Sequence, residues 1–214
     1  PLFGILLLVG AGCANGTPRF VTSEEGVLQE EAEPTQTELD EIKTLADQLN
    51  QQQKQSRMYD AFPGVLSDEE RLNQIATIKT EKGDIVVELF GQTAPKTVSN
   101  FITLSKDGYF NGLTFHRRVE GFVIQGGDPS GNGSGGPGYT FEDELDDDYT
   151  YERGIVAMAN RGPNTNGSQF FIMLEGNPLP KQYTIFGRVT SGMDVVDAIA
   201  IGDTMTTVKI VPAQ

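Results

Sequence analysis

The sequence predicts a mainly β domain, a closed antiparallel barrel of eight strands with two α-helices over its ends. Three observations predict this fold. Short runs rich in β-branched and aromatic residues recur from residue 74 onward, separated by Gly, Pro and Asn turns. Only two stretches of that region have the apolar spacing of a helix. The region, residues 74–214, is about 140 residues long, which suits one ordinary domain.

The elements of this domain follow in order. "QIATIKTEKGDIVVELF" predicts a hairpin around its Glu-Lys-Gly-Asp turn, and "APKTVSNFITLSKDGYF" predicts a helix with Pro95 in its first turn. A second helix is predicted to start with Ser191 and Asp194 as its capping pair. The remaining strands are predicted from "LTFHRRV", "GFVIQGG", "GIVAMAN", "SQFFIML", "YTIFGRV" and "TTVKIV".

The chain has 214 residues, and its first thirteen, "PLFGILLLVGAGC", resemble an export signal. Their apolar run of about eleven residues is shorter than the ~20 that span a bilayer, but it suits a signal sequence. The chain starts with Pro1 rather than Met, so we expect this signal to be truncated at its start. Cys13 follows Ala11 and Gly12, as in bacterial lipoprotein signals, where that cysteine is lipidated. The alternative is a buried apolar segment with an inert Cys13.

Three further segments are predicted before the domain. Residues 14–36 are acidic and poor in large apolar side chains, which predicts a disordered linker. Residues 37–58 have Leu39, Ile42 and Leu45 at helical spacing, with Thr37 as a plausible N-cap, and residues 59–73 are read as a connector. The amphipathic helix is interpreted either as a docking or coiled-coil segment or as a spacer that packs on the domain.

Charge and composition exclude several classes of function. The formal net charge is −14 and no basic stripe is present, which argues against a nucleic-acid partner. A single Cys and a single His leave no disulfide framework and no ordinary structural zinc site within one chain. The acidic run of residues 142–148 lacks the residue order of a calcium loop and is read as a solvated surface loop. No metal is therefore predicted.

The stretch "GNGSGG" at residues 131–136 satisfies the G-x-G-x-x-G pattern of dinucleotide-binding loops. That pattern has meaning only where a helix follows and presents its N-terminus to the phosphates. Here Pro137 and Gly138 follow at once, and then a run of carboxylates. No nucleotide is predicted.

Familiar catalytic groups are missing from the sequence. His116 is the only imidazole, and neither Asp nor Ser stands at a spacing typical of a nucleophile motif. Any reaction of this domain must therefore need no nucleophile, metal or general base.

Two segments instead combine apolar side chains with single polar groups: "FHRRVEGFVIQGGDPSGNGSGGPGY" and "GIVAMANRGPNTNGSQFFIM". Together they resemble the cyclophilin family of peptidyl-prolyl isomerases, over nearly all of residues 74–212. The resemblance implies an eight-stranded barrel capped by two helices. It also implies catalysis without a cofactor, and proline-containing peptide segments of client proteins as partners.

Isomerisation of an X–Pro bond suits such a site. The barrier to rotation is ~18–20 kcal/mol because the C–N bond has partial double-bond character. Both isomers are close in energy, so a catalyst only has to stabilise the twisted amide. It needs a dry pocket for the pyrrolidine ring, polar groups that hold the flanking backbone, and a donor near the prolyl nitrogen.

The resemblance assigns these roles to single residues. Arg117 corresponds to the family's catalytic arginine, the donor toward the prolyl nitrogen, assisted by Gln125 and Phe122. The other predicted substrate-binding residues form the pocket or grip the peptide: Val123, Ala159, Asn160, Gln169, Phe171, Leu179 and Tyr183. Gln125 and Gln169 would hold the arginine and the substrate carbonyl, and Ala159 and Asn160 would act through backbone atoms.

Each of these residues also has a structural alternative. Phe122 and Phe171 are equally typical of a plain core, and glutamines cap strand ends. Arg117 alone would fit a surface ion pair. His116 is expected to form a structural hydrogen bond, and strand alternation would point Arg118 away from the pocket.

The sequence departs from the family pattern at the pocket. Pro178 stands where many members have a tryptophan, Tyr183 replaces a histidine, and Val123 replaces a common methionine. Turnover should survive, because Tyr183 and Val123 keep the pocket apolar. Binding of the inhibitor cyclosporin, which depends on that tryptophan, is predicted to be weak.

The sequence thus predicts an exported, lipid-anchored, monomeric peptidyl-prolyl isomerase that acts on unfolded or flexible proteins outside the cytoplasm. Its membrane contact would be a lipid on Cys13 alone. The alternative is a proline-peptide-binding module that serves as a chaperone or tether, with incidental turnover.

Overall fold

The computed structural model describes residues 20–22, 28–30, 35–45 and 57–213. The chain divides into two compact units, Pro1–Leu49 and Asn50–Gln214. Cys13 and the predicted export signal lie outside the described residues. Within the described ranges, no helix has the length and apolar character needed to cross a membrane.

The first unit contains two short strands and one described helical stretch. Strands β1 (Phe20–Thr22) and β2 (Leu28–Glu30) pair antiparallel within the segment predicted as a linker. A helix covers residues 36–45. Thr37 is not its N-cap: the Glu38 N–H donates to the Thr35 hydroxyl at 3.4 Å and the Thr35 N–H donates to the Glu38 carboxylate at 2.7 Å. This reciprocal pair starts the helix two residues earlier than predicted.

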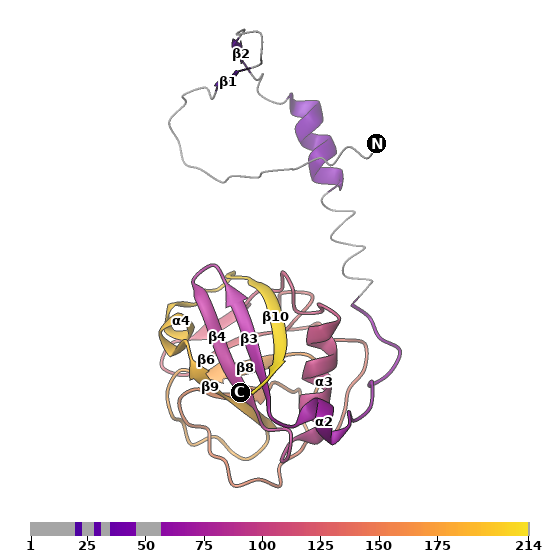
Figure 1. The fold of residues 1–214 in the computed structure, drawn as a ribbon, viewed down its shortest axis with the longest axis vertical. Helices are drawn as coiled ribbons and strands as arrows, with labels where there is room; N and C mark the ends of the chain where they lie inside the picture. The colour runs from indigo at the N-terminus through magenta and orange to yellow at the C-terminus, as the bar shows by residue number, and fades with distance from the viewer. Residues whose placement is uncertain (1–19, 23–27, 31–34, 46–56, 214) are drawn as a thin grey trace. The chain divides into compact units, whose positions relative to one another are not determined.

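The second unit is built on one eight-stranded antiparallel sheet, which confirms the predicted mainly β fold class, but the sheet is a strongly curled half-barrel rather than a closed barrel (Figure 1). Its strands lie in the order β10-β3-β4-β9-β7-β8-β6-β5. Their bounds are β3 Gln74–Thr80, β4 Gly83–Leu89, β5 Arg117–Val119, β6 Val123–Gly126, β7 Ile155–Met158, β8 Phe170–Met173, β9 Ile185–Ser191 and β10 Met205–Pro212. The first two form the hairpin predicted from "QIATIKTEKGDIVVELF".

The sheet curls until its edge strands β5 and β10 approach each other, but no regular ladder joins them. Backbone hydrogen bonds instead connect the residues just before β5 with residues around the start of β10. Phe115 N–H donates to the Asp203 carbonyl at 2.9 Å, and Met205 N–H donates to the Leu113 carbonyl at 2.8 Å. Strand β5 has only three residues. These two bonds and an isolated bridge between Thr114 and Thr204 link the segment before β5 to the start of β10.

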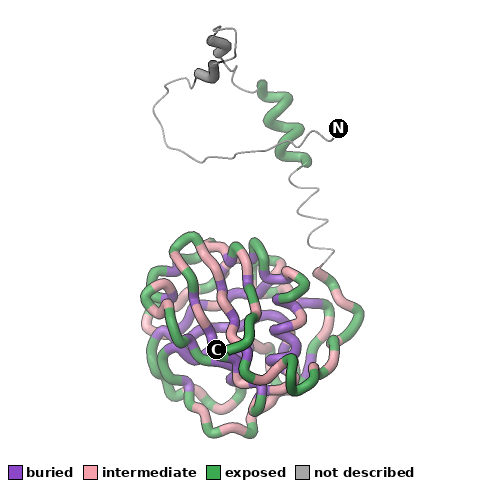
Figure 2. The backbone as a smooth tube through the Cα atoms, viewed as in Figure 1, coloured by how far each residue is buried: buried purple, intermediate pink, exposed green. Residues whose placement is uncertain are grey.

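Three helices lie against the sheet or each other: α2 (Asp68–Arg71), α3 (Pro95–Lys106) and α4 (Met193–Ala198). Helix α3 begins at Pro95, as predicted, and contacts β10, whereas α4 contacts β4. The predicted Ser191–Asp194 capping pair is wrong. Ser191 is the last residue of β9, and Gly192, in the left-handed conformation, is the N-cap of α4. Buried residues fill the interior of the curled sheet and the inner side of α3 (Figure 2).

The acidic run of residues 142–148 is more than the solvated loop that the sequence predicted. Helix α3 has Ala94 as its N-cap, which offers no side-chain acceptor. The Glu144 carboxylate supplies the cap from 48 residues away, accepting from Lys96 N–H at 2.8 Å and Thr97 N–H at 2.9 Å. The Asp147 side chain is 2 % exposed and pairs with Lys181. These carboxylates anchor the long loop to the domain.

Candidate active site

Strands β7 and β8, with the first two residues of β6 and of β9, are apolar on both faces of the sheet. Successive side chains of a strand point to opposite faces, and here both sets are buried. One set joins the main core inside the curled sheet: Ile124, Val156, Met158, Phe170, Ile172 and Phe186. The other set forms a second cluster: Val123, Ile155, Ala157, Phe171, Met173 and Ile185, with Tyr151. The continuous apolar runs in the sequence reflect these two buried faces.

The second cluster contains most of the predicted pocket residues. Val123 and Phe171 belong to it, and partly buried side chains that pack against it include Phe122, Ala159, Leu179 and Tyr183. The Tyr183 and Phe171 rings meet edge to face, with centroids 5.5 Å apart and planes at 87°. The structure thus brings these residues together on the outer face of the sheet, away from the main core.

Strand register places the predicted catalytic arginine on that same face. Arg117 of β5 pairs with Gln125 of β6, Gln125 pairs with Phe171 of β8, and Phe171 pairs with Ala157 of β7. Paired residues of adjacent strands point to the same side of a sheet. A cation, an amide and an aromatic ring therefore stand side by side in one row at the edge of the apolar cluster.

Arg117 is exposed, and within the described residues it forms no ion pair. Its one hydrogen bond runs from Nη1 to Gln125 Oε1, at 3.4 Å. The structural alternative for Arg117, a surface ion pair, is therefore not found among the described residues. Arg118 points away from the pocket, as strand alternation predicts, and donates to the carbonyls of Asp197 at 3.0 Å and Ile199 at 2.7 Å.

The two predicted glutamines form a relay behind Arg117. Gln125 Nε2 donates to Gln169 Oε1 at 2.9 Å. Gln169 Nε2 in turn donates to the carbonyls of Gly133 at 3.0 Å and Gly135 at 2.8 Å. Gln169 is 8 % exposed, and both hydrogens of its amide are engaged by the glycine-rich loop. Its predicted contact with a substrate carbonyl would require one of these bonds to open.

The glycine-rich loop, residues 131–138, is organised around a buried carboxylate. Asp128 is 1 % exposed and accepts from the backbone N–H groups of Ser130 at 2.7 Å, Asn132 at 2.9 Å and Gly133 at 2.5 Å. A phosphate-binding loop would direct such N–H groups at its ligand. Here the protein's own carboxylate occupies them, which fits a loop that shapes a peptide groove.

Backbone groups for a peptide are available at Ala159 and Asn160. The Ala159 N–H is used internally, donating to the Gln169 carbonyl at 2.9 Å. Among the described residues, the N–H and C=O of Asn160 and the C=O of Ala159 have no hydrogen-bond partner. The Asn160 side chain donates to the Gln182 carbonyl at 2.8 Å, which fixes this segment at the rim.

His116 does not form the structural hydrogen bond that the sequence predicted. Both ring nitrogens are buried and have no partner among the described residues. Burial lowers the pKa of His116 below its ordinary value, and Arg117 adds to that effect while Asp128 opposes it. Burial therefore favours the neutral form of this ring.

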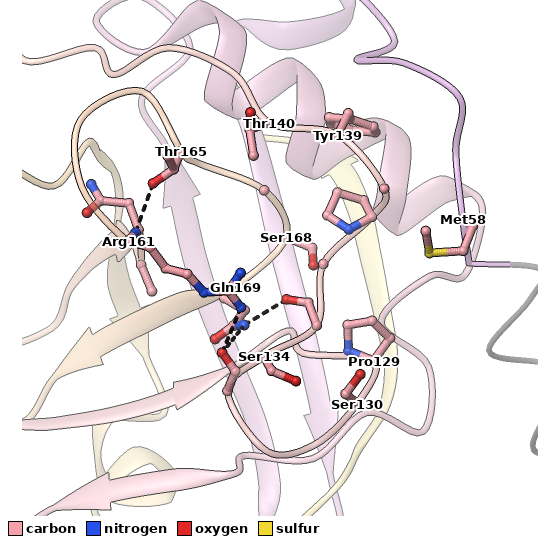
Figure 3. Close-up of a pocket in the computed structure, with 18 of the residues that line it drawn as sticks. Met58, Pro129, Ser130, Ser134, Tyr139, Thr140, Arg161, Thr165, Ser168 and Gln169 are labelled. Carbon is pink, nitrogen blue, oxygen red and sulfur yellow. Dashed lines mark hydrogen bonds between the residues drawn. The ribbon is translucent and has the colours of Figure 1, made fainter.

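A cavity of about 760 Å³ is shown in Figure 3, and it adjoins this row because Gln125 is one of its lining residues. Gln125, Ala159, Asn160 and Gln169, all predicted from the sequence, line it together with much of the glycine-rich loop. Several further lining residues were not predicted, among them Arg161 and Met58. Arg161 directly follows Asn160 in "MANRGPNTN", so the motif offered a signal for it, whereas nothing near Met58 in the sequence indicates a site.

Comparisons with known proteins agree with this geometry. Residues 75–213 match the family described as "Cyclophilin type peptidyl-prolyl cis-trans isomerase/CLD". The chain is similar to a peptidyl-prolyl cis-trans isomerase of Helicobacter pylori (strain ATCC 700392 / 26695), 48% identical over 137 residues, which are 62% of this chain and 84% of that protein.

Solved structures show the same fold. A crystal structure of a cyclophilin type peptidyl-prolyl cis-trans isomerase of Cryptosporidium parvum has a TM-score of 0.61 and 38% identity, covering 66% of this chain and 99% of that one. A crystal structure of the same protein in the presence of the dipeptide Ala-Pro has a TM-score of 0.60 and 37% identity, covering 64% and 98%.

The strongly curled eight-stranded antiparallel sheet, with its helices, has the cyclophilin fold. The chain belongs to the cyclophilin type peptidyl-prolyl cis-trans isomerase family, and it is an isomerase of X–Pro peptide bonds.

Proposed function

We propose that this isomerase works by stabilising the twisted X–Pro amide through Arg117, with the proline ring held on the apolar cluster around Phe171. The observation that carries the proposal is the cation itself: Arg117 is exposed, stands in register with Phe171 through Gln125, and has no ion pair among the described residues. The related Cryptosporidium protein was crystallised in the presence of Ala-Pro, which supports a proline-containing peptide as the ligand here.

The chemistry follows from the electronics of the amide. As the C–N bond rotates, resonance is lost and the prolyl nitrogen recovers its lone pair. A guanidinium N–H directed at that nitrogen interacts more strongly with the twisted amide than with the planar one, so it lowers the barrier rather than only binding substrate. No bond to the protein forms, and no proton has to leave the substrate.

The apolar cluster contributes by excluding water. A dry surface under the pyrrolidine ring strengthens the interaction between the guanidinium and the nitrogen, because electrostatic interactions weaken in a high dielectric. Gln125 keeps Arg117 near this position at little cost in mobility, since a 3.4 Å contact leaves the side chain free to adjust.

The test is proline exchange in a short Ala-Pro peptide, followed by NMR, with the full chain and two variants. Arg117→Ala should lower the exchange rate by about 10²–10³, the loss typical of removing one transition-state donor. Arg188→Ala is the matched control. It removes another exposed arginine, on β9, whose ion pair to Glu152 in the described structure is 3.7 Å long, and should leave exchange unchanged.

Binding must be measured beside the rate. Chemical-shift changes on titration with the peptide should persist in Arg117→Ala, because the apolar cluster is intact. Binding without acceleration by the unmodified chain would overturn the enzymatic mechanism and favour the alternative, a proline-peptide-binding chaperone or tether.

The proposed clients are unfolded or flexible exported proteins, and the proposed location is the outer side of the cell membrane. Support comes from the apolar run of about eleven residues in "PLFGILLLVGAGC" and from Cys13 after Ala11 and Gly12. Mass spectrometry of the membrane fraction should find a lipid on Cys13. Recovery of unmodified Cys13 in intact, membrane-bound protein would contradict this anchor.

A further inference from the structure

Residues 57–66, here called the arm, precede the family domain in sequence but lie on its surface. Tyr59 N–H donates to the Pro137 carbonyl at 2.8 Å, and Leu66 N–H donates to the Ser99 hydroxyl at 2.9 Å. Arg57 Nη2 donates to the Asn111 carbonyl at 2.6 Å. The arm is thus bonded to the domain at its start, middle and end.

Aromatic packing reinforces these bonds. The Tyr59 ring lies 6.1 Å from the Tyr109 ring and 6.3 Å from the Tyr139 ring. The Phe62 ring lies 6.1 Å from Tyr139 and 5.2 Å from Phe141. Because Tyr139 follows the glycine-rich loop, the arm braces the far side of the loop that shapes the groove.

The arm passes closest to the glycine-rich loop at Gly138. Its φ is +98°, and a Cβ built there would stand 2.6 Å from the Tyr59 carbonyl oxygen and 3.2 Å from Met58 Cε. Only glycine fits this position, because a left-handed backbone and a crossing chain coincide. The approach places Met58 among the residues that line the cavity (Figure 3).

Met58 is both exposed and part of the cavity lining. Its side chain is 62% exposed in the described structure. Three other large apolar residues of this unit are comparably exposed, Val65, Ile201 and Val211, and none of them lines the cavity. An unbranched thioether adapts to many apolar partners, which suits a surface that contacts varied sequences.

The same cavity reaches the isomerisation site. Gln125 and Gln169 line it, and these belong to the relay behind Arg117. An extended chain whose proline lies on the apolar cluster can therefore place a neighbouring side chain in the cavity. At about 760 Å³ the cavity has the size of ordinary ligand pockets.

The charges of the residues that line the cavity limit which client side chains it can bind. Arg161 is the only charged residue among those that line the cavity, and its Nη2 already donates to the Gly133 carbonyl at 3.0 Å. No carboxylate among the lining residues would receive a cationic side chain. Met58, Pro129 and Pro137 supply apolar surface instead.

We propose that Met58 is a specificity-determining residue, which binds an apolar side chain of the client a few residues from the isomerising proline. This inference rests on the proposed function, since it places the client's chain across the same site. The arm thereby extends the peptide-binding surface beyond the family domain.

The test compares peptides of two lengths on the full chain. The short peptide is a blocked Ala-Pro. The long peptides carry three further residues on each side, either Leu-containing or Gly and Ser only; three extended residues reach about 10 Å. Met58→Ala should leave kcat/KM for the short peptide unchanged. For the Leu-containing peptide it should lower kcat/KM by ~3–10-fold through KM, as loss of partial apolar burial predicts.

Three comparisons keep the test decisive. Met58→Leu should restore most of the preference for the Leu-containing peptide. Val65→Ala, an exposed arm residue outside the cavity, should behave like the unmodified chain. If Met58→Ala changes all peptides equally or none, the inference is overturned. Affinity for the long peptides is also titrated by NMR without reference to turnover, so a chain that binds but does not isomerise would refute the mechanism and still test Met58.

Discussion

At the scale of single residues, the proposed mechanism depends on the absence of an ion pair at Arg117 among the described residues. A cation with no ion pair among the described residues, and one long contact to Gln125, keeps its charge available for the substrate. The rigidity lies one step behind it, where Gln169 connects Gln125 to the carbonyls of Gly133 and Gly135. In the proposed mechanism, the side-chain amides of Gln125 and Gln169 position the guanidinium of Arg117, and the guanidinium stabilises the twisted amide electrostatically.

His116 should make the free energy of unfolding depend on pH, and the direction of that dependence follows from its lowered pKa. Burial lowers its pKa in the folded protein, so between the ordinary value of about 6.5 and the lower folded value the unfolded chain binds more protons. The free energy of unfolding should therefore fall as the pH drops below about 6.5. Urea unfolding at pH 7.5 and 5.5 measures it, and His116→Gln should remove the part of the decrease that belongs to this ring. An identical decrease in the variant would contradict the assignment.

Pro178 makes cyclosporin sensitivity a second test at this scale. Pro178 is exposed at the position that corresponds to the family's tryptophan, and Tyr183 packs edge to face on Phe171 where others have a histidine. Pro178→Trp should tighten the Kd for cyclosporin by about 30-fold, the ~2 kcal/mol typical of a tryptophan hot spot. Calorimetric titration of both proteins measures it, with catalytic exchange as the control for folding. Equal, tight binding by the unmodified chain would contradict the prediction.

The predicted site residues lie close together in the fold, because they stand in two contiguous segments that form adjacent strands and the loop beside them. The hydrogen-bond partners of the site side chains were not predictable from the sequence. That Gln169 donates to the loop carbonyls, and that His116 has no partner among the described residues, depends on how residues 133–135 fold back. Such contacts are set by tertiary packing, which local patterns do not encode.

At the scale of elements, strands were predictable where both faces are buried. "IVAM" and "FFIM" are continuous apolar runs, and each splits its side chains between the core and the outer cluster. Helix starts were less predictable, because the signals were shared between neighbouring residues or came from far away. Ser191 belongs to β9 rather than to α4, and α3 is capped by Glu144, from a distant loop.

The glycine-rich loop offers a matched pair of substitutions. Gly138→Ala adds a methyl group where φ is +98° and the Tyr59 carbonyl would stand 2.6 Å away, whereas Gly136 has no heavy atom within 4 Å of such a Cβ. Gly138→Ala should cost about 2 kcal/mol and lower the Tm by ~4–8 °C. Gly136→Ala should leave the Tm nearly unchanged. Thermal unfolding by circular dichroism compares them, and equal Tm values for the two variants would contradict the crossing of the arm at Gly138.

At the scale of the whole molecule, the folding unit begins before the family domain. Residues 59–73 were read as a connector, yet Tyr59, Phe62 and Leu66 pack against the core of the domain. The predicted helix over residues 37–58 also ends before this point, since Arg57 and Met58 are not helical. Sequence patterns missed the arm because its few apolar residues have neither helical nor strand spacing. Their aromatic partners lie 50 to 80 residues further along the chain.

Two truncated chains test where the unit begins. A chain that starts at residue 57 keeps the arm and should retain the Tm of the full chain. A chain that starts at residue 67 loses three partly buried apolar side chains, about 1 kcal/mol each, which predicts a Tm lower by ~6–12 °C. The shorter chain should still isomerise a blocked Ala-Pro peptide, because Arg117, Gln125 and Phe171 do not touch the arm through any hydrogen bond or ring contact in the described structure. Equal Tm values for the two chains would show that the arm contributes nothing to folding, and Met58 would then have no fixed place beside the groove.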